Sequence, residues 1–157
     1  MKKWIIVIAL LLGFACKKKN SNDCSVAVCP DIYIAGPFLR FNLLDNTTNQ
    51  DLFFTSSPQY QLKDLAVYKY KNITDTAHLP VYIDSLTTSK HFVIISSEGI
   101  ATVFIQIQNQ KVDTIDIVSK PVFTNCCLSG YIFESLKLNG KLICNNCAAS
   151  IVVNIKK

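Results

Sequence analysis

The sequence predicts an all-β protein, an antiparallel β-sandwich of immunoglobulin-like or transthyretin-like kind with about eight strands. Apolar and polar residues alternate with a period of two along most of the chain after Pro37. Turn signals separate these stretches about every 8–12 residues, as in a sandwich of short strands. Helical periodicity is limited to one turn within residues 57–64. A small β-barrel buries one face of alternating strands in the same way and is the alternative.

The first strand is expected at residues 39–43, because apolar Leu39, Phe41 and Leu43 alternate there with polar residues. A turn rich in Asn and Thr follows at residues 45–51. Further strand-like stretches are short and are separated by turn-forming residues. They lie at residues 65–71, 81–84, 92–96 and 151–155.

Two hairpins are expected in the second half of the chain. One joins residues 101–107 to residues 112–118 through a polar linker. The other joins residues 131–138 to residues 141–144 through the Asn-Gly dipeptide at 139–140, which type I′ turns favour. No internal repeat or interior linker interrupts the pattern, so one domain is expected over residues 29–157.

The formal net charge of +5 arises at the two ends of the chain. Lysines cluster at positions 2–3, 17–19 and 156–157, whereas the segment between residues 20 and 155 has a net charge of −2. A folded part that is mildly acidic lacks the basic face by which proteins bind nucleic acid. Nucleic acid is therefore not an expected partner.

The first 15 residues have the layout of a secretory signal peptide. Lys2 and Lys3 precede a nine-residue apolar run, and small residues then lead to Cys16. The apolar run is too short to span a bilayer, which takes about 20 residues. Residues 1–15 are therefore expected to be removed on export.

A cysteine directly after a small residue at the end of such a leader resembles the lipobox of bacterial lipoproteins. In that family the cysteine thiol is acylated and becomes the new N-terminus, so the resemblance implies lipidation of Cys16. Two or three acyl chains make a stable membrane anchor, whereas one is marginal. Residues 16–28 are expected to form a polar stalk between this lipid and the domain.

The chain as a whole resembles the small envelope lipoproteins of Bacteroidota. The resemblance is carried by the lipobox and stalk, by residues 38–45 and 60–70, and by the CC…CxxC arrangement near the C-terminus. It implies a lipid anchor in the outer membrane of a diderm bacterium, on the periplasmic or the cell-surface side, and no particular activity. Three Asp-Ser/Thr-aliphatic triplets resemble the periplasmic O-glycosylation sequon of such bacteria, which makes candidates of Thr76, Ser85 and Thr114.

Six cysteines remain once Cys16 is lipidated, and an even number in an exported chain predicts a disulfide framework. Neighbouring residues of a strand point to opposite faces, so Cys126 and Cys127 are expected to have different partners. A bridge from either one to the C-x-x-C motif closes a loop of about 20 residues. The framework is expected to pin the Asn-Gly hairpin and the Cys24/Cys29 segment to the sheet. The candidate cysteines are Cys24, Cys29, Cys126, Cys127, Cys144 and Cys147.

Other chemistry is less well supported by the sequence. The cluster of Cys126, Cys127, Cys144 and Cys147 supplies four thiols, but vicinal cysteines fit zinc knuckles poorly and the C-x-x-C lies between predicted strands rather than at a helix N-terminus. His78 and His91 stand in no recognised catalytic motif. Strand tyrosines offer either a ligand platform or ordinary cross-strand pairing; they are Tyr60, Tyr68, Tyr70 and Tyr82.

The sequence therefore predicts a non-enzymatic envelope lipoprotein, a disulfide-stapled β-sandwich that serves as a binding or accessory module. Its expected partners are the membrane, through the N-terminal lipid, and an envelope protein or glycan recognised by loops of the sandwich. No cofactor, metal or catalytic residue is expected. The alternatives are a metal-binding or thiol-redox role for the four-cysteine cluster, and a structural subunit of an outer-membrane complex that adds a strand at a sheet edge.

Overall fold

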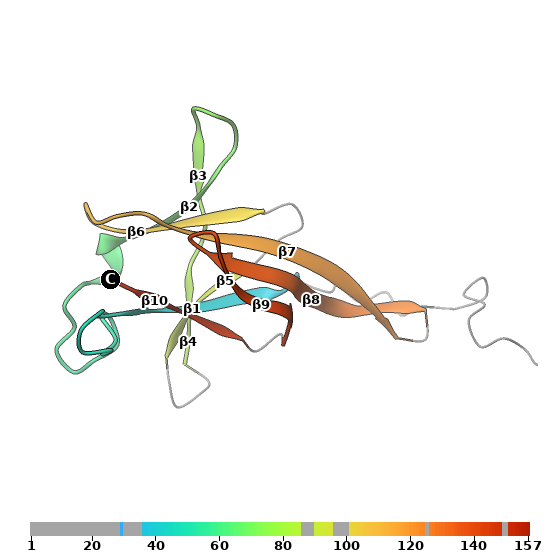
Figure 1. Ribbon diagram of the computed structural model, residues 1–157, viewed down its shortest axis with the longest axis horizontal. Helices are drawn as coiled ribbons and strands as arrows, with labels where there is room; N and C mark the ends of the chain where they lie inside the picture. Colours follow the sequence, from blue (N-terminus) through green and yellow to red (C-terminus); the bar gives the residue numbers. More distant parts are fainter. Residues whose placement is uncertain (1–28, 30–35, 86–89, 96–100, 125, 149–150) are drawn as a thin grey trace, which may run out of the picture.

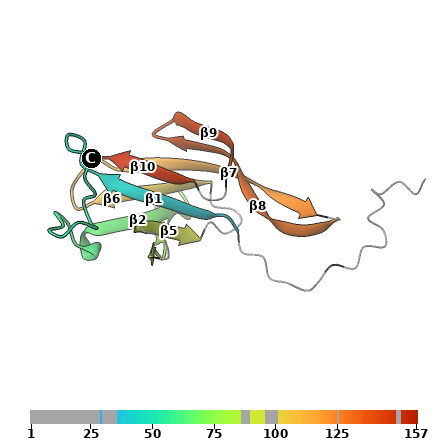
Figure 2. The ribbon, with the colours of Figure 1, turned by 90° about the horizontal axis from the view of Figure 1, so that it is seen from below.

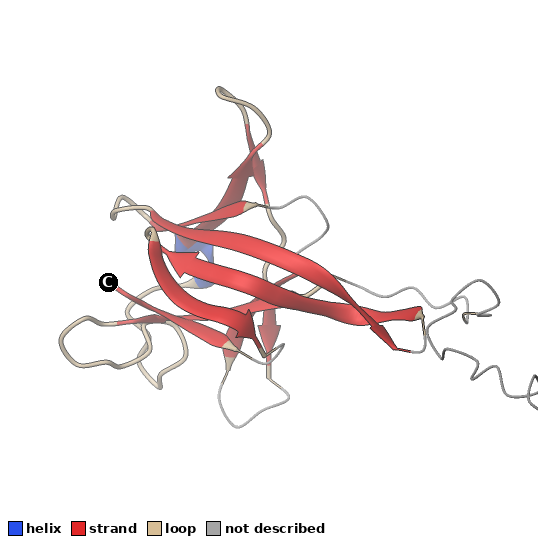
Figure 3. Cartoon of the chain, turned by 45° about the vertical axis from the view of Figure 1, so that its right-hand side comes forward, coloured by secondary structure: helices blue, strands red, loops and turns tan. Residues whose placement is uncertain are grey.

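Ten strands and one short 3-10 helix make up the part of the chain that the computed structural model describes. The described residues are 29, 36–85, 90–95, 101–124, 126–148 and 151–157. The strands form two sheets that pack face to face, and Figure 3 shows how little other regular structure accompanies them. The predicted all-β sandwich is confirmed, with ten strands rather than about eight.

The four-stranded sheet has the order β10-β1-β5-β4, and the six-stranded sheet has the order β3-β2-β6-β7-β8-β9. The first sheet consists of β1 (Phe38–Leu44), β4 (Tyr82–Asp84), β5 (His91–Ile95) and β10 (Val152–Lys156). The second consists of β2 (Leu65–Tyr70), β3 (Thr76–His78), β6 (Thr102–Ile107), β7 (Asp113–Thr124), β8 (Cys127–Leu138) and β9 (Lys141–Cys147). The 3-10 helix, Leu62–Asp64, lies inside the segment where one helical turn was predicted.

The core lies between the sheets and is made by alternate residues of each strand. Leu39, Phe41 and Leu43 of β1 all point inward and are fully buried, as their spacing predicted. The ring of Phe41 stacks on that of Phe92 with their centroids 5.2 Å apart. Other fully buried side chains come from both sheets: Ile94, Ile155, Val103, Ile105, Ile107, Ile115, Phe133 and Leu136.

One strand pair departs from the antiparallel prediction. β1 and β10 run parallel, with Arg40 opposite Val152 and Leu44 opposite Lys156, whereas every other strand pair among the described residues is antiparallel. A tight turn forces its two strands to be antiparallel, but β1 and β10 are separated by the rest of the described chain. Their relative direction is therefore set by packing and not by a turn.

The hairpin of β7 and β8 is much longer than predicted. Each strand has 12 residues, and pairing continues to Thr124 opposite Cys127, although the sequence predicted that the first strand ends at residue 118. β6 pairs with β7 only up to Asp116, so beyond that point one edge of β7 has no strand partner and Pro121, which lacks an N–H, is tolerated there. The distal part of the hairpin, residues 119–124 and 126–135, is called the arm below. Figures 1 and 2 both show it extending beyond the other strands.

Lys157 closes the end of the sandwich opposite the arm, where Figure 1 marks the C-terminus. Its backbone N–H donates to Leu44 O at 2.9 Å, and its carbonyl accepts from the Asn46 N–H at 2.7 Å. Its ammonium forms an ion pair with Asp113, and the two side chains are only 6% and 8% exposed. Asn139 Nδ2 donates a hydrogen bond to Asp113 Oδ1 at 2.7 Å. The other carboxylate oxygen, Oδ2, accepts no hydrogen bond, and the Lys157 ammonium neutralises its charge.

Candidate binding groove and disulfide framework

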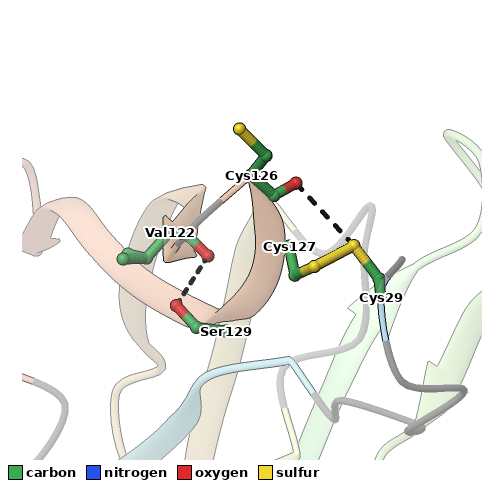
Figure 4. Close-up of a disulfide and its surroundings, with 5 residues drawn as sticks. All are labelled: Cys29, Val122, Cys126, Cys127 and Ser129. Atoms are coloured by element: carbon green, nitrogen blue, oxygen red, sulfur yellow. Dashed lines mark hydrogen bonds between the residues drawn. A yellow bond between two sulfur atoms is a disulfide. The ribbon is translucent and has the colours of Figure 1, made fainter. Parts of the chain in front are cut away.

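A disulfide ties the N-terminal segment to the tip of the arm. Cys29 bonds to Cys127, the first residue of β8, across 98 residues of sequence with the two Cα atoms 5.3 Å apart (Figure 4). Cys29 Sγ also lies 3.9 Å from the carbonyl oxygen of Cys126. This is a contact rather than a hydrogen bond, because a disulfide sulfur carries no proton. The N-terminal chain is thus held covalently at the far end of the arm.

Cys126 belongs to the tight turn at the arm tip. Its φ of 67° lies in the left-handed region, and Figure 4 shows its side chain pointing away from the Cys29–Cys127 bond. Cys126 is itself disulfide-bonded, with a partner outside the described residues. The remaining candidate, Cys24, lies outside the described residues. The vicinal cysteines therefore have different partners, but the cause is the turn and not alternation along a strand.

The predicted bridges from Cys126 or Cys127 to the C-x-x-C motif do not form. Instead Cys144 and Cys147 bond to each other, with their Cα atoms 5.7 Å apart. β9 pairs with β8 only from Leu138 to Phe133, six residues short of Cys127 and therefore about 20 Å from it at the usual strand rise. A disulfide needs Cα atoms within about 7 Å, so the long arm prevents the expected pairing.

The Cys144–Cys147 bond depends on a local twist of β9. Residues three apart in a regular strand point to opposite faces, but Asn146 has a φ of 48°, which rotates the chain between the two cysteines. Cys144 then lies opposite Leu136 and Cys147 opposite Phe133, and both sulfurs pack on the core. A bulge near Leu142 and this disulfide make β9 an irregular outer strand, a feature that discourages edge-to-edge pairing.

These pairings bear on the metal and thiol-redox alternatives. Cys127 and the C-x-x-C motif lie about 20 Å apart along β8, so the four thiols do not gather into a tetrahedral set. Among the described residues, no group of three or more His, Cys, Asp or Glu side chains is arranged to hold a metal ion. Thiol exchange needs an accessible sulfur; in the Cys144–Cys147 bond, Cys147 is only 4% exposed and Cys144 is half-buried.

The histidines lie on different sheets and make ordinary structural contacts. His91 Nδ1 is 2.8 Å from Asn42 Oδ1 on the neighbouring strand. The His78 ring packs edge-on to Tyr68 with their centroids 6.4 Å apart. Each histidine thus contacts a cross-strand neighbour, and the two belong to no common site.

The three residues of the predicted O-glycosylation triplets differ in exposure. Thr76 in β3 and Ser85 after β4 are exposed, whereas Thr114 in β7 is half-buried. The aspartates that precede all three have ion-pair partners. Asp84 pairs with Arg40 and Asp113 is buried against Lys157, whereas the pair between Asp75 and Lys71 lies at the surface. Thr76 is therefore the one of the three that combines an exposed side chain with an exposed aspartate before it.

An aromatic cluster covers part of the outer face of the six-stranded sheet. Tyr68 stacks on Phe104, its cross-strand neighbour, with centroids 5.4 Å apart, and Tyr70 meets Phe104 edge-on at 4.8 Å. Partial burial, with a smaller contribution from Tyr70, raises the pKa of Tyr68. The rings pack against one another and leave little free surface for a ligand. Of the two interpretations of the strand tyrosines, these contacts favour ordinary cross-strand pairing for Tyr68 and Tyr70.

A groove of about 330 Å³ lies on the outer face of the four-stranded sheet. Its bed is formed by Phe38 and Val93, and Tyr82 borders it from β4; the register places Val93 between Arg40 and Tyr82. Phe38 is 39% exposed and Tyr82 is 53% exposed. The other lining residues are Ile83, Asp84 and Ser85.

An ion pair forms the polar side of this groove. Arg40 Nε lies 3.3 Å from Asp84 Oδ2, and the side chains are 26% and 13% exposed. The guanidinium Cζ is also 6.0 Å from the centre of the Phe38 ring, within the range of a cation–π interaction. The groove therefore presents two aromatic rings beside a fixed donor and a fixed acceptor.

Sequence reasoning found Tyr82 as a candidate ring but missed Phe38, Arg40 and Asp84 as its neighbours. Alternation along β1 places Phe38 and Arg40 on the face opposite Leu39, and Tyr82 and Asp84 share a face by the same rule. What the sequence did not show is that β5 lies between these strands and brings their outer faces together.

Comparison with family models, with curated proteins and with solved structures finds no match for this chain. Within the described ranges, no helix is long and apolar enough to cross a bilayer. The functional argument therefore depends on the chain's own residues and their geometry.

Proposed function

We propose that this protein is a non-enzymatic lipoprotein of a diderm outer membrane whose β-sandwich binds an envelope glycan in the groove on the four-stranded sheet. Export through the leader and lipidation of Cys16 are supported by the sequence of residues 1–16. Disulfides are typical of extracytoplasmic compartments, and the chain has two among its described residues. Both supports are independent of what the sandwich binds.

The groove carries the binding part of the proposal. A sugar ring has one face of aliphatic C–H groups and a rim of hydroxyls, so it requires an apolar surface with donors and acceptors at the edge. The exposed rings of Phe38 and Tyr82 offer that surface, and Arg40 and Asp84 offer the polar groups. A volume of about 330 Å³ is at the small end for ligand sites, which suits one or two sugar rings.

The polar groups of the groove favour binding over catalysis. Arg40 and Asp84 are paired with each other, and an arginine does not give up its proton under ordinary conditions. General acid–base work requires a group that exchanges a proton with the substrate near neutral pH. The pair is instead suited to hold hydroxyl groups by charge-assisted hydrogen bonds.

Glycan binding is tested with the mature protein on an array of bacterial envelope glycans, followed by calorimetry of the best ligand. Replacing Tyr82→Ala should lower the affinity by about tenfold or more, as loss of an aromatic contact residue does. Tyr70→Ala is the matched control, because Tyr70 is 52% exposed against 53% for Tyr82 but lies on the other sheet. Equal losses in the two variants, or an array with no ligand, would count against the groove.

Anchoring is tested by the intact mass of protein extracted from envelopes. The expected mass begins at an acylated Cys16, and six alkyl groups are gained only after reduction, one for each of the other cysteines. Additional hexose-sized increments would show that the protein is glycosylated, for which the Thr76, Ser85 and Thr114 triplets are the candidate sites. An unmodified N-terminus contradicts the lipoprotein proposal, and alkylation without reduction reopens the thiol alternatives.

The structural-subunit alternative requires a sheet edge that accepts a strand. β3 and β4 are edge strands of only three residues, and β9 is bulged and bridged. β10, with five residues, is the most regular outer strand in the described part of the chain. Crosslinking in intact envelopes from β10 to a partner strand supports this alternative over glycan binding.

A further inference from the structure

We infer that the tip of the arm rests on the membrane surface, with Phe123 in the headgroup region and the opposite end of the sandwich pointing away from the lipid. This orientation depends on the lipid anchor of the proposed function. It is independent of the groove and of the ligand bound there.

The first argument is where the N-terminal chain joins the domain. The Cys29–Cys127 bond fixes residue 29 at the arm tip, and Cys126 beside it carries a second disulfide. Cys29 is 13 positions along the chain from Cys16, so the tip lies within about 45 Å of the lipid-bearing residue even if that stretch is fully extended. The tip is thus the point of the folded domain closest along the chain to the anchor.

The second argument is the chemistry of the tip. Residues 121–133 include no Asp, Glu, Lys or Arg. The charged residues of the arm lie at its base, where Lys120 Nζ is 3.8 Å from Glu134 Oε1 and 2.9 Å from Asn146 Oδ1. Phe123 is 61% exposed near the tip, more than any other aromatic side chain described. Trp and Tyr are enriched at the membrane–water interface, and Phe occurs with Trp and Leu on the apolar face of segments that lie in it.

The third argument is the contrast with the opposite end. Hydrogen bonds join its turns there, from Asn46 N to Lys157 O, from Gln108 N to Asp64 O and from Lys157 Nζ to Lys111 O. This end carries charged groups at the surface, among them Asp45, Lys63, Asp64, Lys111 and Lys141. Turning it toward the lipid would remove water from these charges, which is unfavourable. Charge and covalent attachment therefore indicate the same orientation.

A single exposed ring orients a domain but does not anchor it. The acyl chains supply the membrane affinity but do not by themselves fix the orientation of the domain. Contact of Phe123 with the headgroup region adds a preferred orientation to that anchor.

The chain offers a clean optical test, because its single Trp is Trp4 in the leader. The Phe123→Trp and Leu62→Trp variants each place one fluorophore in the mature, lipidated protein. Leu62 is the matched control: it is 53% exposed and lies at the opposite end, in the 3-10 helix. Both proteins are reconstituted into phosphatidylethanolamine–phosphatidylglycerol vesicles with and without brominated acyl chains, and circular dichroism checks that each is folded.

Brominated lipid should lower the emission of the Phe123→Trp variant by about twofold, because a tryptophan at the membrane interface lies close to the bromines. The emission of Leu62→Trp should stay unchanged, because that tryptophan is held away from the lipid. Flotation of the same vesicles measures anchoring separately. Protein that floats with no quenching at position 123, or with equal quenching at both positions, overturns the orientation and leaves the anchor intact. Protein that does not float overturns the anchor and the orientation together.

Discussion

The sandwich body and the arm consist of the same kind of strand but are stabilised in different ways. In the body, side chains such as Phe41, Phe92 and Ile105 are completely buried between two sheets. Beyond Phe133, where pairing with β9 ends, the arm has one layer of two strands, and Phe123 near its end is 61% exposed. A two-stranded ribbon is marginally stable in water. The Cys29–Cys127 bond therefore stabilises the tip of the arm, whereas buried apolar side chains stabilise the body.

Because of this difference, the stability of the arm depends on the redox state of the compartment more than the stability of the body does. Apolar packing does not depend on the redox state of the compartment, whereas a disulfide persists only where it is oxidising. The body is therefore expected to fold even where its one disulfide, Cys144–Cys147, is reduced, and the arm to take its final form only in an oxidising compartment. The predictions below test this division, beginning with the largest expected effect.

Phe41→Ala should lower the free energy of unfolding by about 3–5 kcal/mol, because it leaves a cavity where the ring stacked on Phe92. Phe123→Ala on the arm should change it by less than about 0.5 kcal/mol, since an exposed side chain leaves no cavity. Urea unfolding of the two oxidised variants measures both. Similar losses would mean that the arm is packed in solution and that the contrast is wrong.

Lys157→Met should destabilise the protein by about 3 kcal/mol, because it leaves the Asp113 carboxylate buried without its counter-charge. Adding Asp113→Asn should recover most of the loss, since the remaining groups are neutral and Asn139 stays close by. Thermal unfolding of the single and double variants completes the cycle. A Lys157→Met variant as stable as the wild type would show that the C-terminal end of the body does not depend on this pair.

Replacing Cys29 and Cys127 together with Ser should destabilise the protein by about 2 kcal/mol, at the low end for a disulfide. The loop it closes spans 98 residues, but Cys126 still carries its own disulfide at the tip, so the chain stays partly tethered. Limited proteolysis should now cut the arm. The control is the Cys144→Ser/Cys147→Ser variant, whose arm should resist cleavage, and cleavage there would show that the arm is not held by its tip.

Asp45→Ala should give the smallest effect, a modest fall in melting temperature at pH 7. The N–H of Thr48, its hydroxyl and the N–H of Thr47 all donate to Asp45, and these bonds hold the pKa of its carboxyl below the ordinary value. A lowered folded pKa stabilises above the unfolded value of about 4, and the gain is lost as the pH falls through the folded pKa. Asn72→Ala removes a similar turn whose acceptor does not titrate, so its effect should not depend on pH.

Scanning calorimetry at pH 7 and pH 3 distinguishes these two turns. The difference between wild type and Asp45→Ala should shrink at pH 3, while the difference for Asn72→Ala should stay the same. A loss for Asp45→Ala that is constant with pH would show that the turn, and not the carboxylate charge, stabilises that end of the body.

Local pattern predicted the body far better than the arm. Alternation identified the buried face of β1, and Asn139-Gly140 marked a hairpin that the structure forms between β8 and β9. The arm was missed because Pro121 and two bulges obscure the alternation of β7, and because pairing along an open edge depends on the partner strand. β3 was missed because its three residues are too few to show a period.

The candidate groove was partly visible for the same reason. The sequence shows that Tyr82 and Asp84 share a face of one strand and that Phe38 and Arg40 share a face of another. It does not show that β5 separates those strands, because strand order depends on contacts between distant residues. An ion pair between residues 44 positions apart has no local signal.

The sequence by itself determined the class of the fold, the buried side of regular strands such as β1 and the number of cysteines available for disulfides. These follow from local chemistry: the two-residue period of an extended chain, the φ preferences of turn residues and the count of thiols. The tertiary structure alone decided the parallel pairing of β1 with β10, the length of the arm, the Cys29–Cys127 and Cys144–Cys147 bonds and the burial of Lys157. Each of these joins residues whose positions depend on how the two sheets pack, and distance in space is not encoded in any short stretch of the chain.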